Sequence, residues 1–288
     1  MLNQCQKLIL NIQDEWLNTF KFDQSWQTEQ LSPKENYTNR IMTSTGDVFE
    51  KAGIAMSQLH SNKLPPAASE RYPKLTGKPF DVVGISLVLH PKNPHVPTVH
   101  ANLRFFQCGS VWWFGGGMDL TPHYPVMEDC IHWHATLKKT CDQTDKTFYP
   151  TFKPWCDEYF YLKHRQQMRG IGGIFFDDIN QLGFKPLLAF IKDLGQCFID
   201  AYQPLVIKHM NQPYTAAEKN FQLHRRSRYA EFNLLYDSGT LFGVQFGGII
   251  ESILMSMPPM AAWHYQWETK PGTPEAQLDE YLQPKEWV

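Results

Sequence analysis

The chain has 288 residues, of which 42% are hydrophobic and 19% are charged. This composition suffices for one large buried core and lies near the upper size of a single domain. The 27 Lys and Arg residues do not exceed the 29 Asp and Glu residues, so the basic excess that nucleic-acid binding requires is absent. We therefore expect one domain over residues 1–288 and no nucleic-acid partner, although clustered arginines could still bind a small anion.

The first sixteen residues indicate an amphipathic helix and not a secretory signal, because Lys7, Asp14 and Glu15 lie among or beside their apolar positions. No apolar run reaches the length of a membrane span. The six cysteines form no C-x-x-C pair and no zinc spacing, which favours reduced, structural thiols. The sequence therefore predicts a cytoplasmic protein without a membrane span.

Residues 5–20 and 48–60 suggest helices or mixed local structure before the pattern changes at Asp81. From there to Phe106 apolar residues recur with period two on either side of a Pro-rich connection, which predicts a strand, a loop and a second strand. Successive side chains of a strand point to opposite sides, so each strand has one apolar face and one face with polar groups. If these faces align, five polar residues share one side of a sheet: Ser86, His90, His100, Asn102 and Arg104.

The rest of the chain alternates between helical and strand-like patterns. Helices are predicted over 128–141, 154–170 and 184–211, and a strand over 170–179. Residues 228–248 alternate around the D-S-G-T sequence that begins at Asp237, as a hairpin would, and make Asp237 a turn residue. Helices before, between and after antiparallel pairs predict an α+β fold, in which helices cover a large antiparallel sheet.

Histidine is the usual acid or base near neutral pH and a common metal ligand, but the eleven histidines match no local metal motif. A hydrogen-bonded structural imidazole is the commoner role for any one of them. His90 and His100 are better candidates because they share the predicted polar strand face with Arg104. An inward arginine is costly unless it meets an anion, so Arg104 predicts either a carboxylate-binding position or, equally, an exposed sheet edge.

Three further features leave alternatives open. The run Gly115–Gly117 lacks the spacing of a nucleotide loop and predicts a bulged turn or, less often, close approach of the backbone to a flat ligand. Asp177 and Asp178 end an apolar strand, where one could cap a helix and the other be a buried acid. The basic run 224–228 precedes a predicted strand, and at least one of its arginines is expected at a solvated helix end.

Five long segments resemble one family. They are, in chain order, VVGISLVLHPKNPHVPTVHANLRFF, VWWFGGGMDLTPHY, IHWHATLKKTC, WCDEYFYLKHRQQMRGIGGIFFDDI and RYAEFNLLYDSGTLFGVQFGGIIESILMSMPP. Together they are similar to the oxygen-dependent coproporphyrinogen III oxidases, and the resemblance extends from about residue 10 to Val288. Composite motifs of this length are far more specific than a short signature.

The resemblance implies a homodimer built on a large antiparallel sheet with helices on both faces, a dimer interface within residues 229–264, and an active site between sheet and helices. It also implies the oxidative decarboxylation of coproporphyrinogen III to protoporphyrinogen IX, in which the propionates of rings A and B become vinyl groups and dioxygen is the oxidant. No organic cofactor is expected, and a divalent metal ion, manganese first, is an option.

The resemblance assigns residues to the site as well. His100 is the expected proton donor, and Asp237 together with Asp178 or Asp177 supplies the acids beside the pyrrole nitrogens. Substrate-binding positions fall on Ser86, Asn102, Leu103, Arg104, Gly247 and Gly248. A metal site of four histidines falls on His90, His100, His134 and His164. A metal role and a proton-donor role therefore compete for His100.

Two positions depart from the family pattern. Ser238 and Ile249 stand where the family commonly has arginine, and each lost charge-assisted contact to an anionic substrate would cost about 1.5–3 kcal/mol. A tetrapyrrole-binding relative with impaired catalysis is therefore the alternative to an active enzyme, and a metal-dependent oxygenase with an unrelated substrate is a weaker third. His100, Arg104 and the retained acids favour the enzyme, and the arginines of 224–228 could compensate for the loss.

Overall fold

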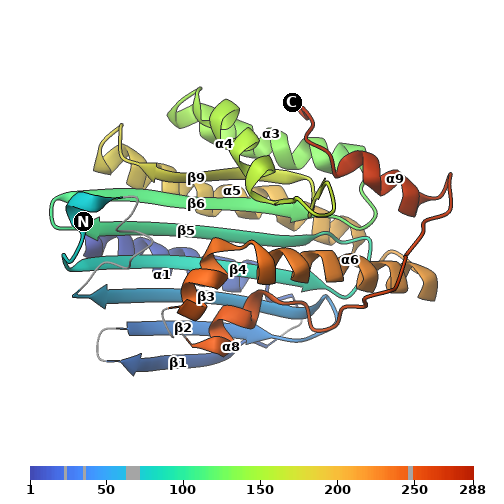
Figure 1. The fold of residues 1–288 in the computed structure, drawn as a ribbon, viewed down its shortest axis with the longest axis horizontal. Coiled ribbons are helices and arrows are strands. Elements are labelled where there is room, and N and C mark those ends of the chain that lie inside the picture. The colour runs from blue at the N-terminus through green and yellow to red at the C-terminus, as the bar shows by residue number, and fades with distance from the viewer. Residues whose placement is uncertain (23–24, 35–36, 63–71, 246–248) are drawn as a thin grey trace.

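A seven-stranded antiparallel sheet forms the centre of the structure, a computed structural model that describes residues 1–22, 25–34, 37–62, 72–245 and 249–288 (Figure 1). Each strand is antiparallel to its neighbours. In their order across the sheet the strands are β1 (Gln27–Lys34), β2 (Tyr37–Ser44), β3 (Phe49–Ser61), β4 (Phe80–Pro91), β5 (Thr98–Cys108), β6 (Val111–Thr121) and β9 (Gly172–Ile179). A separate small hairpin comprises β7 (Tyr161–Leu162) and β8 (Gln167–Met168).

Helices lie on both faces of this sheet (Figure 1). One layer contains α1 (Leu2–Thr19), α3 (Met127–Thr144), α4 (Phe148–Tyr159) and α5 (Phe184–His209), and the other contains α6 (Ala216–Leu235), α7 (Ser238–Gln245) and α8 (Ile250–Ile253). The remaining elements are α9 (Pro274–Tyr281) and two 3-10 helices, η1 (Pro73–Leu75) and η2 (Leu254–Ser256). The predicted α+β fold, with an antiparallel sheet covered on both faces, is therefore confirmed.

The main hydrophobic core lies between the sheet and the layer of α1, α3, α4 and α5. The alternating residues predicted for the apolar face of β4 and β5 all belong to it and are at most 1% exposed: Val83, Ile85, Leu87, Leu89, Val99, Ala101, Leu103 and Phe105. Helix α5 supplies Phe198 and Tyr202, whose rings pack against Trp16 and Phe20 from the N-terminal segment. Among the described helices, none combines the length and the apolar character of a membrane span.

Residues 228–245 form helices, so the predicted hairpin is wrong. Helix α6 continues to Leu235, and α7 begins at Ser238. A capping box starts α6, because the Thr215 hydroxyl accepts a hydrogen bond from the Glu218 backbone and the Glu218 carboxylate accepts one from the Thr215 backbone. Once this helix is nucleated and packed, it overrides the local period-two pattern near Asp237.

Other segments also differ from expectation. Residues 49–61 are strand β3, α4 ends at Tyr159 before the β7–β8 hairpin, and Gly115–Gly117 lie inside β6 and not in a turn. The arginines of 224–228 lie within α6 and are only 1–8% exposed. Contacts with distant parts of the chain determine the structure of these segments. Arg226, for example, donates hydrogen bonds to Glu50 at 2.6 Å and to the Pro91 carbonyl at 2.9 Å.

Candidate active site

The polar face of the central strands gathers the residues that the sequence placed there. Ser86 lies opposite Asn102, and Asn102 lies opposite Gly117 on the next strand. His100 lies opposite Asp119 in the same way. Directly opposed residues of an antiparallel pair share a face, so the alignment predicted for Ser86, His90, His100, Asn102 and Arg104 is confirmed.

At the centre of this face, His100 pairs with a buried carboxylate. Its Nδ1 lies 2.9 Å from Oδ1 of Asp119, which is 1% exposed. Arg169 donates two further hydrogen bonds to Asp119, of 2.9 and 2.8 Å. Burial alone would raise the pKa of Asp119, but the Arg169 guanidinium and the hydrogen bond with His100 outweigh it and hold the pKa below its usual value.

An ionised Asp119 can only accept, so Nδ1 of His100 carries the hydrogen of this bond. The other ring nitrogen, Nε2, is then the one that can take up or release a proton. The His100 side chain is 20% exposed, whereas Asp119 is enclosed. This is the arrangement of an oriented acid or base whose carboxylate partner does not itself meet the ligand.

Arg169 is held from several sides. Its guanidinium carbon lies 4.1 Å from the ring centre of Phe160 and 4.4 Å from that of Tyr229. It also donates a 2.6 Å hydrogen bond to Asn233 of α6. Burial would lower the pKa of Arg169, yet the neighbouring Asp119 raises it above the usual value. The positive charge that lowers the pKa of Asp119 is thus permanent and fixed in place.

His90 lies on the same face but is fully buried. Its Nε2 is 2.9 Å from the Ser256 carbonyl, and its ring meets that of Tyr229 edge-on. Burial, followed by the charge of Arg226, moves the pKa of His90 well below its usual value. His90 is therefore a neutral histidine that joins the sheet to the segment after α8.

Arg104 and its neighbours form a second cluster on this face. Its guanidinium lies 3.0 Å from Asn102 Oδ1 and 3.0 Å from Asp177 Oδ1, and its side chain is 32% exposed. A Cβ at Gly115 would lie 2.9 Å from Arg104 Nε and would collide with Asp177. Gly115 therefore makes room for this ion pair, and Gly117, on the same face, makes room for Phe175 of β9.

The carboxylates near this face differ in their surroundings. Asp177 pairs with Arg104, whereas Asp178 follows it with a φ of 58°, in the left-handed region that few non-glycine residues adopt. Asp237 accepts a 2.9 Å hydrogen bond from the Tyr159 hydroxyl and two of 2.8 Å from Thr240. Asp237 thus begins α7 as a cap instead of sitting in a hairpin turn.

The structure does not bring the four expected metal ligands together. His134 lies on α3, and its ring nitrogens contact the Tyr149 hydroxyl at 3.0 Å and the Ile171 carbonyl at 3.1 Å. His164 follows β7, where it contacts Tyr236 and Glu231. Within the described residues no group of three or more His, Cys, Asp or Glu side chains could hold a metal ion. The expected four-histidine site is therefore not formed by the described part of one chain.

Three expected substrate-binding positions do not contribute to the polar face that the structure describes. Leu103 is fully buried in the main core. Its side chain lies on the opposite face from Asn102 and Arg104, because adjacent strand residues alternate, so it cannot line the polar face. Gly247 and Gly248 lie outside the described residues.

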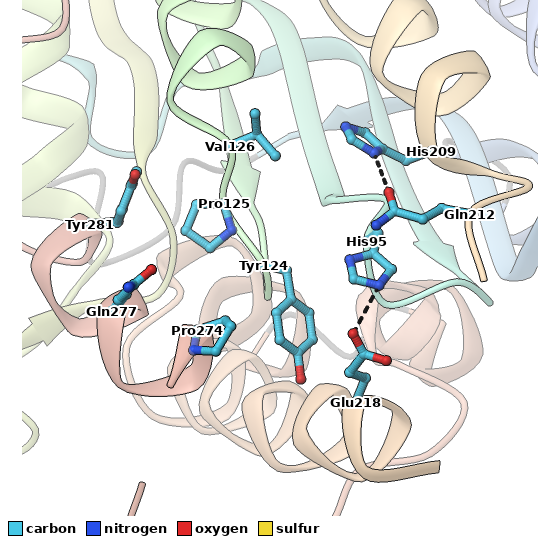
Figure 2. Close-up of a pocket in the computed structure, with 10 residues that line it drawn as sticks. All are labelled: His95, Tyr124, Pro125, Val126, His209, Gln212, Glu218, Pro274, Gln277 and Tyr281. Atoms are coloured by element: carbon cyan, nitrogen blue, oxygen red, sulfur yellow. Dashed lines mark hydrogen bonds and ion pairs between the residues drawn. The ribbon is translucent and has the colours of Figure 1, made fainter. Parts of the chain in front are cut away.

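A cavity of about 220 Å³ lies elsewhere, between the loops after β4 and β6, the start of α6, and α9 (Figure 2). None of the predicted site residues lines it. Its polar groups bond to one another: His95 pairs with Glu218 at 3.1 Å, and His209 pairs with Gln212 at 2.9 Å (Figure 2). Behind it, His209 also contacts Asp129 at 2.6 Å.

Sequence reasoning missed Asp119, Arg169 and Tyr159. Asp119 had a usable signal, because it stands two residues after Gly117 and therefore shares its strand face. Arg169 and Tyr159 gave no such signal, since they were assigned to the interior of one long helix that in fact ends at Tyr159.

Comparison with known proteins decides the family. Residues 1–287 match the family model described as coproporphyrinogen III oxidase. The chain belongs to the coproporphyrinogen III oxidase family. Proteins called oxygen-dependent coproporphyrinogen-III oxidase from Francisella tularensis subsp. holarctica (strain LVS) and Francisella philomiragia subsp. philomiragia are each 47% identical to it over 291 residues, which cover 98% of this chain and 94% of the relative. The Francisella tularensis subsp. mediasiatica protein of the same name is 47% identical over 296 residues, with 100% and 96% coverage.

Within this family, the chain keeps the expected histidine, asparagine and arginine of β5 on one accessible face. The family match and the 47% identity to these relatives confirm the resemblance inferred from the sequence motifs. The two positions expected to depart from the family pattern, Ser238 and Ile249, lie at the start of α7 and just before α8.

Proposed function

We propose that this chain catalyses the oxygen-dependent oxidative decarboxylation of coproporphyrinogen III to protoporphyrinogen IX in porphyrin biosynthesis. The observation that carries the proposal is the pair formed by His100 and the buried Asp119, beside the accessible Arg104. Together they provide a proton-transferring group and a carboxylate-binding group on one rigid sheet face. Family membership supports the same reaction.

Each of the two propionates undergoes the same balanced change. A propionic acid side chain and one dioxygen give a vinyl group, one carbon dioxide and one hydrogen peroxide, so the substrate loses two electrons and dioxygen gains two. A base removes a pyrrole N–H proton, the electron-rich ring reacts with dioxygen, and peroxide leaves as the propionate loses carbon dioxide. The protein must therefore hold the macrocycle, accept and donate protons, and exclude water.

Named residues can fill these roles. Arg104 binds a propionate, with Asn102 and Ser86 beside it on the same face. His100 donates a proton to the departing peroxide, because Asp119 keeps its ring oriented. Asp237, with Asp177 or Asp178 at the end of β9, accepts hydrogen bonds from pyrrole N–H groups.

We propose that dioxygen is the co-substrate and that no organic cofactor takes part. If a divalent metal such as manganese is bound, it would polarise an oxygen ligand or substrate carboxylate, but the four expected histidines do not form its site in the described part of one chain. We therefore assign no proton transfer or binding step to a metal.

We also propose a cytoplasmic homodimer whose interface lies within residues 229–264. Large apolar side chains are exposed in this interval, among them Leu234, Leu235, Val244, Ile250 and Trp263. Exposed large apolar side chains are typical of a surface that another protein covers. Sedimentation should give about twice the chain mass of 33.5 kDa, and a species of single-chain mass would contradict the dimer.

An aerobic assay of the purified chain tests the function. Coproporphyrinogen III is supplied, and protoporphyrin fluorescence is followed after chemical oxidation of the product, with an anaerobic control. Oxygen-dependent product with release of carbon dioxide is the expected result. Tight tetrapyrrole binding without product would contradict it and would favour the impaired relative suggested by Ser238 and Ile249.

A further inference from the structure

Tyr159 joins the end of α4 to the start of α7. Its hydroxyl lies 2.9 Å from Asp237 Oδ1 and 2.8 Å from Ser238 Oγ, and it accepts a 3.2 Å hydrogen bond from the Ser238 backbone. Burial, followed by the nearby Asp237 carboxylate, raises the pKa of Tyr159. The hydroxyl therefore keeps its proton at neutral pH and gives it to the hydrogen bond with Asp237, so that Ser238 donates to the tyrosine oxygen.

Aromatic contacts fix the position of this hydroxyl. The Tyr159 ring stacks on Phe175 with a centroid distance of 4.2 Å and an interplanar angle of 13°. Phe160 meets it edge-on at 4.9 Å. Phe175 lies opposite Gly117, so Tyr159 stands directly over the polar sheet face. A tyrosine held in this way has little freedom to turn its hydroxyl away from Asp237.

The Asp237 carboxylate is oriented by neutral donors. Oδ1 accepts from Tyr159, and Oδ2 accepts from the backbone and hydroxyl of Thr240. Among the described residues the hydrogen bonds to this carboxylate thus come from uncharged groups, and the buried guanidinium of Arg169 is near enough to attract its charge but forms no hydrogen bond with it. Its negative charge remains available to attract N–H groups of a ligand, or positive charge that develops on an oxidised ring.

From this geometry we infer that Tyr159 is a positioning residue of the proposed reaction, which fixes the Asp237 carboxylate for the pyrrole N–H groups of the substrate. Ser238 completes the arrangement, because its hydroxyl lies 2.8 Å from the tyrosine oxygen and supports it. The inference rests on the proposed function and extends it to a residue that does not itself touch the reacting atoms.

The test is a double-mutant cycle on Tyr159→Phe and Asp237→Asn. Phenylalanine keeps the ring stack and removes only the hydroxyl. We expect kcat/KM to fall about tenfold, as for loss of one hydrogen bond to a charged group, with most of the fall in kcat. In the Asp237→Asn background the same change should cost less than about twofold, because the partner charge is already gone.

A matched control removes a tyrosine hydroxyl that binds a carboxylate elsewhere. Tyr124 donates a 2.7 Å hydrogen bond to Glu275 beside the cavity of Figure 2, and Tyr124→Phe should leave kcat/KM unchanged. Ser238→Ala should cause a smaller loss than Tyr159→Phe, since it removes only the second hydrogen bond. An equal loss from Tyr159→Phe in both backgrounds, or no loss at all, would overturn the inference.

Wild-type turnover in the same assay reports on the proposed function separately. If the wild type makes no product, the cycle is measured on anaerobic binding of coproporphyrinogen III by calorimetry. Coupling between Tyr159→Phe and Asp237→Asn in the dissociation constant would then support the positioning role although the oxidase proposal had failed. Additive effects would reject it.

Discussion

The two faces of β4 and β5 contain neighbouring residues of the same strands but differ in almost every physical respect. On one face Ile85 and Leu103 are at most 1% exposed and pack in the main core. On the other, the side chains of His100 and Arg104 are 20% and 32% exposed and pair with carboxylates. The apolar face stabilises the sheet by burial, whereas the polar face holds charged groups that are costly unless paired. Residues that stabilise the fold thus alternate along each strand with residues of the candidate active site.

The largest expected effect comes from breaking the ion pair buried on the polar face. Asp119→Ala would leave the Arg169 side chain, 2% exposed, without its carboxylate. We expect a loss of about 3–5 kcal/mol in the free energy of unfolding, together with loss of turnover. Urea denaturation measures the former. In the control Asp142→Ala, which breaks a more exposed pair with Lys138, the loss should stay below about 1 kcal/mol.

His100→Ala should separate catalysis from stability. Removal of a proton-transferring group typically lowers the rate by about 10²–10⁴-fold, and the His100 ring, on the polar face of the sheet, is not part of the main core. Steady-state assays should therefore show a fall in kcat of this size. The urea unfolding curve should stay close to that of the wild type. His132→Ala serves as the control, because the His132 ring contacts the Asp200 carbonyl of α5, in the helical layer on the other side of the sheet from the polar face. Full activity of His100→Ala would reject its assigned role.

A smaller effect should appear in the pH dependence of the unfolding free energy, to which His209 beside the cavity of Figure 2 contributes. The hydrogen bond with Asp129 is the main cause that raises the pKa of His209 above 6.5, with Lys208, Gln212 and His95 also close by. A raised folded-state pKa stabilises the fold fully below about pH 6.5 and less as pH rises through the folded-state value. Wild type should therefore exceed His209→Gln in unfolding free energy more at pH 6 than at pH 9.

His95 provides the opposite case in the same cavity. Burial lowers its pKa, even though Glu218 acts against this. Its contribution should therefore be lost as pH falls below about 6.5, the reverse of His209. If the differences between wild type and His95→Gln and between wild type and His209→Gln changed with pH in the same direction, the assigned charge states would be wrong.

The sequence was sufficient for some of this architecture and not for the rest. The alternation from Val83 to Phe105 predicted the two faces correctly, because each strand buries one side only. The same local rule failed at 228–245, where the capping box at Thr215 lies far upstream of the alternating residues. The pairing of Asp119 with His100 depends on the register of β5 and β6, which the short turn between Cys108 and Val111 fixes and which the sequence analysis did not use. The strand pattern made His100 and Arg104 candidates, and the family resemblance gave them roles and added Asp237. The structure was needed to show that the expected histidine site does not form within the described residues and that Leu103 is buried.

The separation of the two faces is tested most directly by adjacent residues. Anaerobic calorimetry would give the dissociation constant of coproporphyrinogen III for Leu103→Val and Arg104→Ala, with urea unfolding measured on both variants. We predict that Arg104→Ala weakens binding by about tenfold or more with little change in stability, through the loss of a charge-assisted contact. Leu103→Val should lose about 1 kcal/mol of stability and bind normally. Equal weakening by both variants, or normal binding by Arg104→Ala, would contradict the account.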